Sequence, residues 1–351
     1  MTVQGALGFG GLSLRSPPLR RLKKSAAQRR GCKRLTLSNE SELLPILKYL
    51  WQDKCAADVG ENLDILHELP ANWPVRDQGH IRGTCVAFAA LSAVEAYRFW
   101  SGAAQDAEDF SEELLYALMR DKFDLNDHFP DLERDGEIIP GYEDLGASLL
   151  WQAGSALDAY GVSGEANLPY VYDQRGPAFF DETYADAVAS SQMIPVAGDR
   201  EHTVVEMPTA QDRPADKISD SLRYLLSHKT PVCVSFPVLG RQQEFNEWTF
   251  PSGWTTGQIP DPSGPSAKLQ DGRFDSGGGH SVCIVGYCAD PNTEGDGWFL
   301  FRNSWGRRFG HASDFTTGFS YPLERGYGLI STAHVNTYCW EMMFLIPKEE
   351  I

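Results

Sequence analysis

The chain has 351 residues, which is enough for two small domains or one large domain with a sizeable core. Hydrophobic residues make up 42% of it and charged residues 23%, as in an ordinary soluble globular protein. The longest apolar run, from Cys85 to Val94, is far shorter than the roughly 20 residues of a membrane-spanning helix. The sequence therefore predicts no transmembrane segment.

Basic residues are concentrated near the N-terminus. Nine of the 31 basic residues and none of the 48 acidic residues precede Glu40. We expect residues 1–38 to form an irregular basic arm, because they lack hydrophobic periodicity. Residues 15–34 could bind nucleic acid or an anionic surface, act as an organelle transit sequence, or dock onto the acidic body of the chain; a solvated tail is the remaining alternative. The acidic body favours basic substrates or a basic protein partner.

Residues 39–68 are interpreted as a separate, short helical segment. Residues 39–51 have the spacing of an amphipathic helix, with Asn39 or Ser41 as its cap. Five apolar residues share one face of this helix: Leu43, Leu44, Leu47, Leu50 and Trp51. The helix could pack on the body of the protein or block a functional cleft.

A cysteine at the start of a predicted helix is the first candidate for chemistry. Gln78 and Gly79 lie in a loop, and Cys85 is followed at once by an apolar, alanine-rich run with helical spacing up to Trp100. The thiol would face the N–H groups at the positive end of this helix, which favour the thiolate. Taken alone, such a cysteine is more often a small buried apolar residue.

A histidine and an asparagine lie about two hundred residues further along the chain. His280 opens the strand-like run 281–287, and Asn303 follows a second run, 297–302. If the two runs pair as a hairpin around residues 289–296, the two side chains come together.

Three blocks of sequence carry a resemblance to a known family. They are residues 78–88 around Gln78 and Cys85, residues 279–282 around His280, and residues 302–306 around Asn303. In this order they resemble the signatures of papain-like cysteine peptidases, and weaker matches extend the resemblance over about residues 69–346. The resemblance implies an α+β, papain-like two-lobed fold, with a helical lobe over residues 69–190, a β-barrel-like lobe over residues 191–351 and an active-site cleft between them.

The resemblance also implies a role for each candidate residue. Cys85 would attack a peptide carbonyl as a thiolate paired with protonated His280, while Asn303 would orient the imidazole. Gln78 and the backbone N–H of Cys85 would stabilise the oxyanion. An indole would cover the bond between His280 and Asn303 from water. That indole belongs to Trp305. The candidate substrate-binding residues are Gly146, Ser148, Gly279 and Trp305.

The chain departs from the family pattern around the nucleophile. Arg82 lies where secreted members carry a disulfide-bonded cysteine, and the seven cysteines are odd in number with no CxxC pair. We therefore expect a reducing, cytoplasmic location, with an organelle reached through the basic arm as the alternative. Six residues separate Gln78 from Cys85 where the family has five, so this loop must bulge.

The sequence predicts neither a metal ion nor a cofactor. Within the acidic segment 124–143, Asp131, Glu133, Asp135 and Gly136 imitate the opening of a calcium-binding loop. Its twelfth position falls on Tyr142, so we interpret the segment as a solvated acidic loop. Residues 199–216 and 240–276 contain Pro, Gly, Ser and charge without a clear period. We expect them to be irregular insertions.

The predicted activity is hydrolysis of peptide or isopeptide bonds through a thioester acyl-enzyme, with a peptide or protein as substrate. Two alternatives stay open. One is a catalytically silent papain-like module that binds a peptide or a protein. The other is a transpeptidase that keeps the same residues and transfers the acyl group to an amine.

Overall fold

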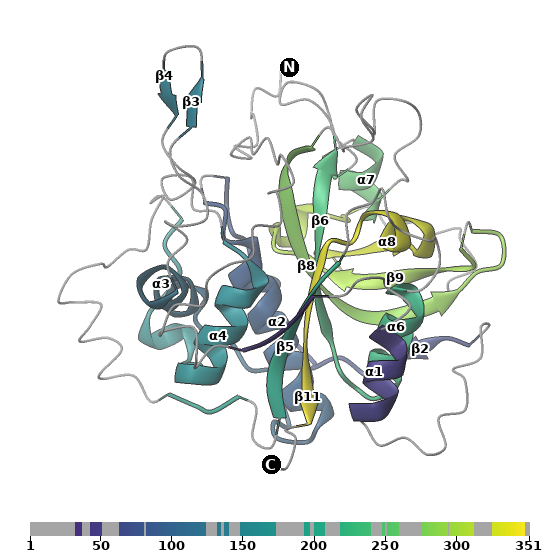
Figure 1. Ribbon diagram of the computed structural model, residues 1–351, viewed down its shortest axis with the longest axis horizontal. Coiled ribbons are helices and arrows are strands. Elements are labelled where there is room, and N and C mark those ends of the chain that lie inside the picture. Colours follow the sequence, from purple (N-terminus) through teal and green to yellow (C-terminus); the bar gives the residue numbers. More distant parts are fainter. Residues whose placement is uncertain are drawn as a thin grey trace.

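A computed structural model describes residues 32–36, 43–50, 63–80, 82–123, 132–134, 137–139, 148–172, 193–196, 200–207, 218–239, 248–249, 251–259, 276–293, 295–311 and 325–347. Over these residues the chain is α+β, as predicted. Three long helices lie together on one side of the molecule, and most strands follow later in the sequence (Figure 1).

The helices of the described residues include one that matches its predicted bounds. The run that begins at Cys85 is helical to Trp100. A second helix begins at Glu112, where the Ser111 side chain caps it by accepting a hydrogen bond from the Leu114 N–H. The helices are α1 (Leu43–Leu50), α2 (Cys85–Trp100), α3 (Glu112–Lys122), α4 (Leu150–Tyr160), α6 (Ile218–Ser227), α7 (Pro251–Thr256) and α8 (Thr332–Tyr338), with short 3₁₀ turns η4 (Glu165–Asn167) and η6 (Gly306–Arg308).

The strands of the described residues form one nine-stranded sheet and one small hairpin. The large sheet contains β1 (Lys33–Thr36), β2 (Ile65–Leu66), β5 (Arg200–Glu206), β6 (Val232–Leu239), β7 (Gln258–Ile259), β8 (Ser276–Ala289), β9 (Gly297–Arg302), β10 (Tyr327–Ser331) and β11 (Glu341–Pro347). Its order is β1-β5-β11-β6-β8-β9-β10-β7, with β2 also paired to β8. Its pairs are antiparallel except β1 with β5 and β7 with β10.

Strand β8 lies between the two hydrophobic cores of the molecule. Alternate side chains of a strand point to opposite faces, so Cys283 and Val285 join the core formed with α2, α3 and α4. Val282 and Ile284 join the second core, which includes residues of α1, α6 and α8. Helix α2 packs on β6 and β8 on one side and on α3 and α4 on the other. The start of α2 and the centre of β8 are therefore adjacent.

The predicted hairpin of the histidine and asparagine runs is confirmed. Strands β8 and β9 are antiparallel, with Ala289 opposite Gly297 and Cys283 opposite Arg302. The prediction that His280 opens its strand is wrong, because β8 begins at Ser276 and its first residues already pair with β6. His280 is therefore an interior residue of a long strand, not its first residue.

The N-terminal segments pack on the body of the protein where they are described. The expectation of an irregular arm is wrong for residues 33–36, which form β1 on the edge of β5. Arg34 of β1 forms an ion pair with Glu206 and lies over the ring of Trp151, so this part of the arm docks onto the acidic body. In α1, buried Leu43 and Leu47 join the second core, and α1 contacts α6. Residues 1–31 lie outside the described residues.

Two segments expected to be irregular contain regular structure. Residues 200–206 form β5, because the β-branched run Thr203–Val205 pairs with both β1 and β11. Residues 251–259 contain α7 and β7. In the acidic segment the described residues form a hairpin of β3 (Leu132–Arg134) and β4 (Glu137–Ile139); the rest of the calcium-like sequence lies outside the described residues.

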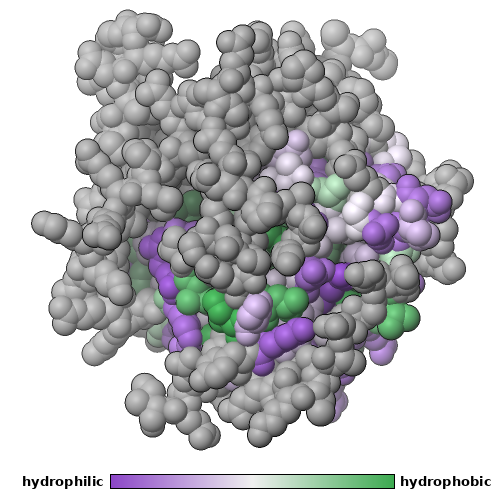
Figure 2. All heavy atoms as spheres, turned by 45° about the vertical axis from the view of Figure 1, so that its right-hand side comes forward, coloured by the Kyte–Doolittle hydropathy of each residue, from purple (hydrophilic) through white to green (hydrophobic). Residues whose placement is uncertain are grey.

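The described surface is mixed in character. In the face shown in Figure 2, apolar residues lie among hydrophilic ones. Within the described residues, no helix has both the length and the apolar character needed to cross a membrane.

Candidate active site

His280 and Asn303 meet where β8 and the end of β9 lie side by side. The imidazole Nε2 of His280 is 2.8 Å from Oδ1 of Asn303, and both residues are buried. An amide oxygen can only accept, so Nε2 carries the proton and donates it to Asn303. In the neutral ring, Nδ1 is then the nitrogen with a free lone pair, and it is the group that can act as a base.

Two indoles surround the imidazole. Trp305 is stacked on it, with ring centroids 4.4 Å apart and planes at 24°, and Trp248 packs edge-on at 5.0 Å and 76°. Burial lowers the pKa of His280 to about 4, although the hydrogen bond to Asn303 acts in the opposite direction. His280 is therefore neutral at pH 7 in this structure.

Cys85 is the first residue of α2, and its thiol lies next to the residue that follows His280. Its sulfur interacts with the backbone and hydroxyl of Ser281 and with the first backbone N–H groups of α2. These contacts favour the thiolate, but burial outweighs them and raises the pKa of Cys85. Burial therefore disfavours the charged form of both Cys85 and His280, and the thiolate–imidazolium pair stays a prediction.

Gln78 is held by the loop of Asn303. Its backbone N–H donates to the Ser304 carbonyl at 2.7 Å, and its Oε1 accepts from the Ser304 hydroxyl at 2.5 Å. Its Nε2 donates to the Arg82 carbonyl at 3.1 Å, inside the loop that leads to Cys85. The one-residue-longer loop therefore keeps Gln78 between the asparagine loop and the start of α2.

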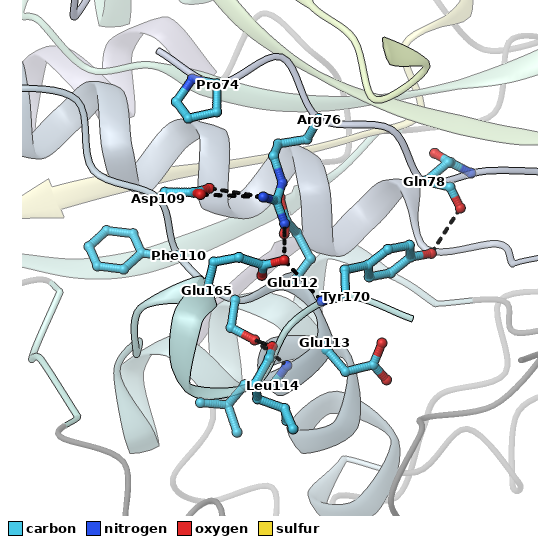
Figure 3. Close-up of polar contacts among 12 residues, drawn as sticks. Pro74, Arg76, Gln78, Asp109, Phe110, Glu112, Glu113, Leu114, Glu165 and Tyr170 are labelled. Atoms are coloured by element: carbon cyan, nitrogen blue, oxygen red, sulfur yellow. Dashed lines mark hydrogen bonds and ion pairs between the residues drawn. The ribbon is translucent and has the colours of Figure 1, made fainter. Parts of the chain in front are cut away.

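A charged cluster around Arg76 supports the same loops, and the sequence did not suggest it. Its guanidinium forms ion pairs with Asp109, Glu112 and Glu165, as Figure 3 shows. Burial raises the pKa of Glu112 to about 8 in spite of the nearby Arg76 charge. The backbone carbonyl of Arg76 accepts from the N–H of Gly306, so the cluster is joined to the chain just after Trp305.

A second buried ion pair connects α2 to β9. Nη1 of Arg302 is 2.9 Å from Oε2 of Glu95, and Nε1 of Trp73 donates to the same oxygen at 2.6 Å. The Arg302 guanidinium also lies over the Trp73 ring, 3.7 Å from its centroid. Because Arg302 immediately precedes Asn303, this pair anchors Asn303 to helix α2. An acid inside the apolar run of α2 was the available signal, since buried acids are normally paired.

The candidate substrate-binding residues lie in different surroundings. Trp305 is buried against His280. A Cβ on Gly279 would come 2.9 Å from Cζ2 of Trp340, so packing is one reason for glycine there. Ser148 precedes α4, and its Oγ is buried with no hydrogen-bond partner among the described residues. Gly146 lies outside the described residues.

Comparisons with known proteins find similarity in fold only. No protein-family model matches the sequence, and no curated protein matches it. Xylellain, a cysteine protease from Xylella fastidiosa, is 19% identical with a TM-score of 0.48, covering 82% of this chain and 85% of that one. Procathepsin L2 from the larval midgut of Tenebrio molitor is 15% identical with a TM-score of 0.49, covering 93% and 76%. A recombinant stem bromelain precursor is 16% identical with a TM-score of 0.44, covering 79% and 67%. The chain resembles these papain-like cysteine proteases in fold.

Proposed function

We propose that the protein is a cysteine peptidase that hydrolyses peptide or isopeptide bonds with Cys85 as nucleophile, His280 as base and acid, and Asn303 as the residue that orients the imidazole. The observation that supports this most directly is the hydrogen bond from Nε2 of His280 to Oδ1 of Asn303. This hydrogen bond leaves Nδ1 as the basic nitrogen of His280. The next residue in the strand, Ser281, contacts the Cys85 thiol.

The acylation step begins from a neutral thiol and a neutral imidazole. As the sulfur of Cys85 attacks the carbonyl carbon, its proton passes to Nδ1 of His280, and the carbonyl oxygen becomes an oxyanion. The carbon–nitrogen bond then breaks, the amine leaves with the proton from Nδ1, and a thioester to Cys85 remains. Asn303 holds the ring in one tautomer and supports the positive charge that forms on it.

Deacylation uses the same groups in reverse. His280 takes a proton from water through Nδ1, and the resulting hydroxide attacks the thioester carbon. The carbon–sulfur bond breaks, the product leaves as a carboxylic acid, and the sulfur of Cys85 regains its proton from the imidazole. If an amine takes the place of water, the same sequence gives transpeptidation.

The oxyanion would be stabilised by Gln78 and by the backbone N–H of Cys85. Nε2 of Gln78 carries two protons, and the Arg82 carbonyl accepts one of them. The second is the proton proposed to reach the oxyanion. One such donor contributes about 3 kcal/mol to stabilisation of the transition state.

A second candidate is a catalytically silent module that binds a peptide or protein. Burial of Cys85 and His280, together with the raised pKa of the thiol, favours this alternative. A peptidase requires that the substrate reach both groups, whereas a binding module does not.

An epoxide that alkylates active-site thiols separates the two candidates. A peptidase is expected to be labelled at Cys85 in the folded state, and labelling should be lost in Cys85→Ala and strongly slowed in His280→Ala. Cys339→Ala, which removes another buried thiol, is the matched control and should leave labelling unchanged. Folded protein that is not labelled, and whose cleavage of a proteome-derived peptide library equals that of Cys85→Ala, would instead support the binding module. Added amines that appear in the products would identify transpeptidation.

A further inference from the structure

Arg82 lies inside the loop that connects Gln78 to Cys85, and its side chain is completely buried. The exposed fraction is 0% for this side chain and 1% for that of Glu113 on α3. The two form a bidentate ion pair, with Nη1 2.5 Å from Oε2 and Nη2 2.9 Å from Oε1. A fork-to-fork pair of this kind fixes orientation as well as distance.

The same guanidinium is held on its other sides. Nη1 donates to the Val171 carbonyl at 2.5 Å, while Glu113 accepts from the Val171 N–H at 3.1 Å. The rings of Tyr116 and Tyr170 lie 5.0 Å and 4.7 Å from the central carbon of the guanidinium. The loop, helix α3 and the chain at residue 171 are thus joined at one point.

Tyr170 joins this cluster to both ends of the loop. Its hydroxyl donates to the Gln78 carbonyl at 2.9 Å, a contact visible in Figure 3, and lies 2.7 Å from Oγ1 of Thr84. Its ring packs edge-on against Phe88 of α2 at 4.9 Å. A displacement of the Arg82 side chain would therefore also displace Tyr170 and the two residues that its hydroxyl contacts, Gln78 and Thr84.

The main chain of Arg82 completes the connection. Its carbonyl accepts from Nε2 of Gln78, so the position of residue 82 sets the direction in which the Gln78 amide points. Ser304 fixes the other end of the same amide through Oε1. The side chain of Arg82 anchors the loop to Glu113 of α3, and its backbone carbonyl orients the amide of Gln78, the proposed oxyanion donor.

We propose that Arg82 and Glu113 are positioning residues that hold the 78–85 loop in the conformation in which Gln78 and the Cys85 N–H converge on the oxyanion. The inference rests on the proposed function. Arg82 occupies the position at which secreted papain-like peptidases carry a disulfide-bonded cysteine. Here the ion pair with Glu113 anchors the loop, which is one residue longer than in that family.

Replacing both charges by apolar side chains tests this role. Removing one partner would leave a buried charge, but an apolar pair of similar volume is often tolerated. The Arg82→Met/Glu113→Leu variant is therefore expected to fold, with kcat lower by about 10²-fold, the scale for loss of an oxyanion donor. KM should change less than threefold. Alkylation of Cys85 by iodoacetamide, which forms no oxyanion, should change less than twofold.

The control is a matched pair at the other end of α2. Arg98 and Glu108 are also bidentate, at 2.6 Å and 3.1 Å, and Arg98 lies over Phe110. Arg98 is thirteen residues beyond Cys85, or about 20 Å along the helix. Arg98→Met/Glu108→Leu should retain wild-type kcat. Tyr170→Phe removes only the hydroxyl that contacts Gln78 and Thr84, so it should lower kcat even if the Arg82 double variant does not fold.

Three results would overturn the inference. The first is an unchanged kcat in the Arg82→Met/Glu113→Leu variant. If that variant does not fold, an unchanged kcat in Tyr170→Phe has the same meaning. Another is a parallel fall of kcat, alkylation rate and thermal stability, which would indicate a structural role only.

If the wild type hydrolyses no peptide, the proposed function fails, and hydrogen exchange then decides whether the ion pair holds the loop. Exchange over residues 77–85 should rise in the Arg82 double variant and not in the Arg98 control; equal exchange in both would reject the inference.

Discussion

The indole of Trp305 lies stacked on the imidazole of His280, with 4.4 Å between ring centroids and 24° between ring planes. This contact contributes to the burial that lowers the pKa of His280 to about 4. The same indole was expected from the sequence to shield the bond between His280 and Asn303. Its position explains why the imidazole is neutral, since water cannot solvate a charged ring from that side.

Opening this contact should change the titration of the imidazole. In Trp305→Ala, water would reach the ring, and the pKa of His280 should rise from about 4 toward its ordinary value of 6.5. NMR titration of the imidazole resonances, assigned with His280→Gln, measures this shift. Trp100→Ala removes an indole that packs on His67 and serves as the control. A His280 pKa that stays near 4 in Trp305→Ala would show that other groups bury the ring.

His280 should also make the fold sensitive to acid. Its pKa is about 4 in the folded protein and 6.5 in the unfolded chain, so only the unfolded chain binds a proton between these values. The contribution is fully present above pH 6.5 and is lost as pH falls from 6.5 to 4. Over that range wild type should lose about 3 kcal/mol more unfolding free energy than His280→Gln.

Comparison with the variant is needed because buried carboxyl groups act in the opposite direction. Burial raises the pKa of Glu112 to about 8 and that of Glu341 to about 7, so their contributions are lost as pH rises. Denaturant titrations of both proteins at several pH values give the difference. Parallel curves for the two proteins would contradict the assignment to His280.

The ion pair between Glu95 and Arg302 should be essential to stability as a pair. Arg302→Met leaves a buried carboxylate without its cation, and we expect a loss of about 3–5 kcal/mol in unfolding free energy. Adding Glu95→Gln should restore part of that loss, because the uncompensated charge is removed. Urea denaturation with an unchanged m-value measures both effects. Arg98→Gln, in a pair that is less buried, should cost under about 1 kcal/mol.

Strand β1 should stabilise the sheet edge to which it binds. Deleting residues 1–36 removes β1 and buried Cys32, whose N–H donates to Oγ of Ser155 on α4. The midpoint of thermal unfolding should therefore fall by a few degrees relative to deletion of residues 1–31, which retains the strand. Equal midpoints would remove a structural role for β1.

Local patterns predicted much of the fold. The apolar spacing after Cys85 predicted α2 with its observed bounds, and the two apolar, strand-like runs 281–287 and 297–302 predicted the β8–β9 hairpin. These elements are encoded by neighbouring residues whose period is visible in the sequence. Strands β1 and β5 were missed, because each is stabilised by partners distant in the sequence rather than by its own short pattern.

The candidate site was predicted in part. The hydrogen bond between His280 and Asn303 was expected from the residue types and their order, and it is present. The ion pair of Arg82 and Glu113 was not, since a charge in a loop is usually solvated and nothing in the sequence indicates that it is buried.

The sequence alone determined which reactive groups this protein has and which elements carry them, because helix starts, hairpins and side-chain chemistry are properties of short segments. Only the tertiary structure decided how strongly burial disfavours the charged form of each group. The pKa of Cys85 and that of His280 depend on desolvation, and desolvation is set by side chains such as Trp305 that come from other parts of the chain.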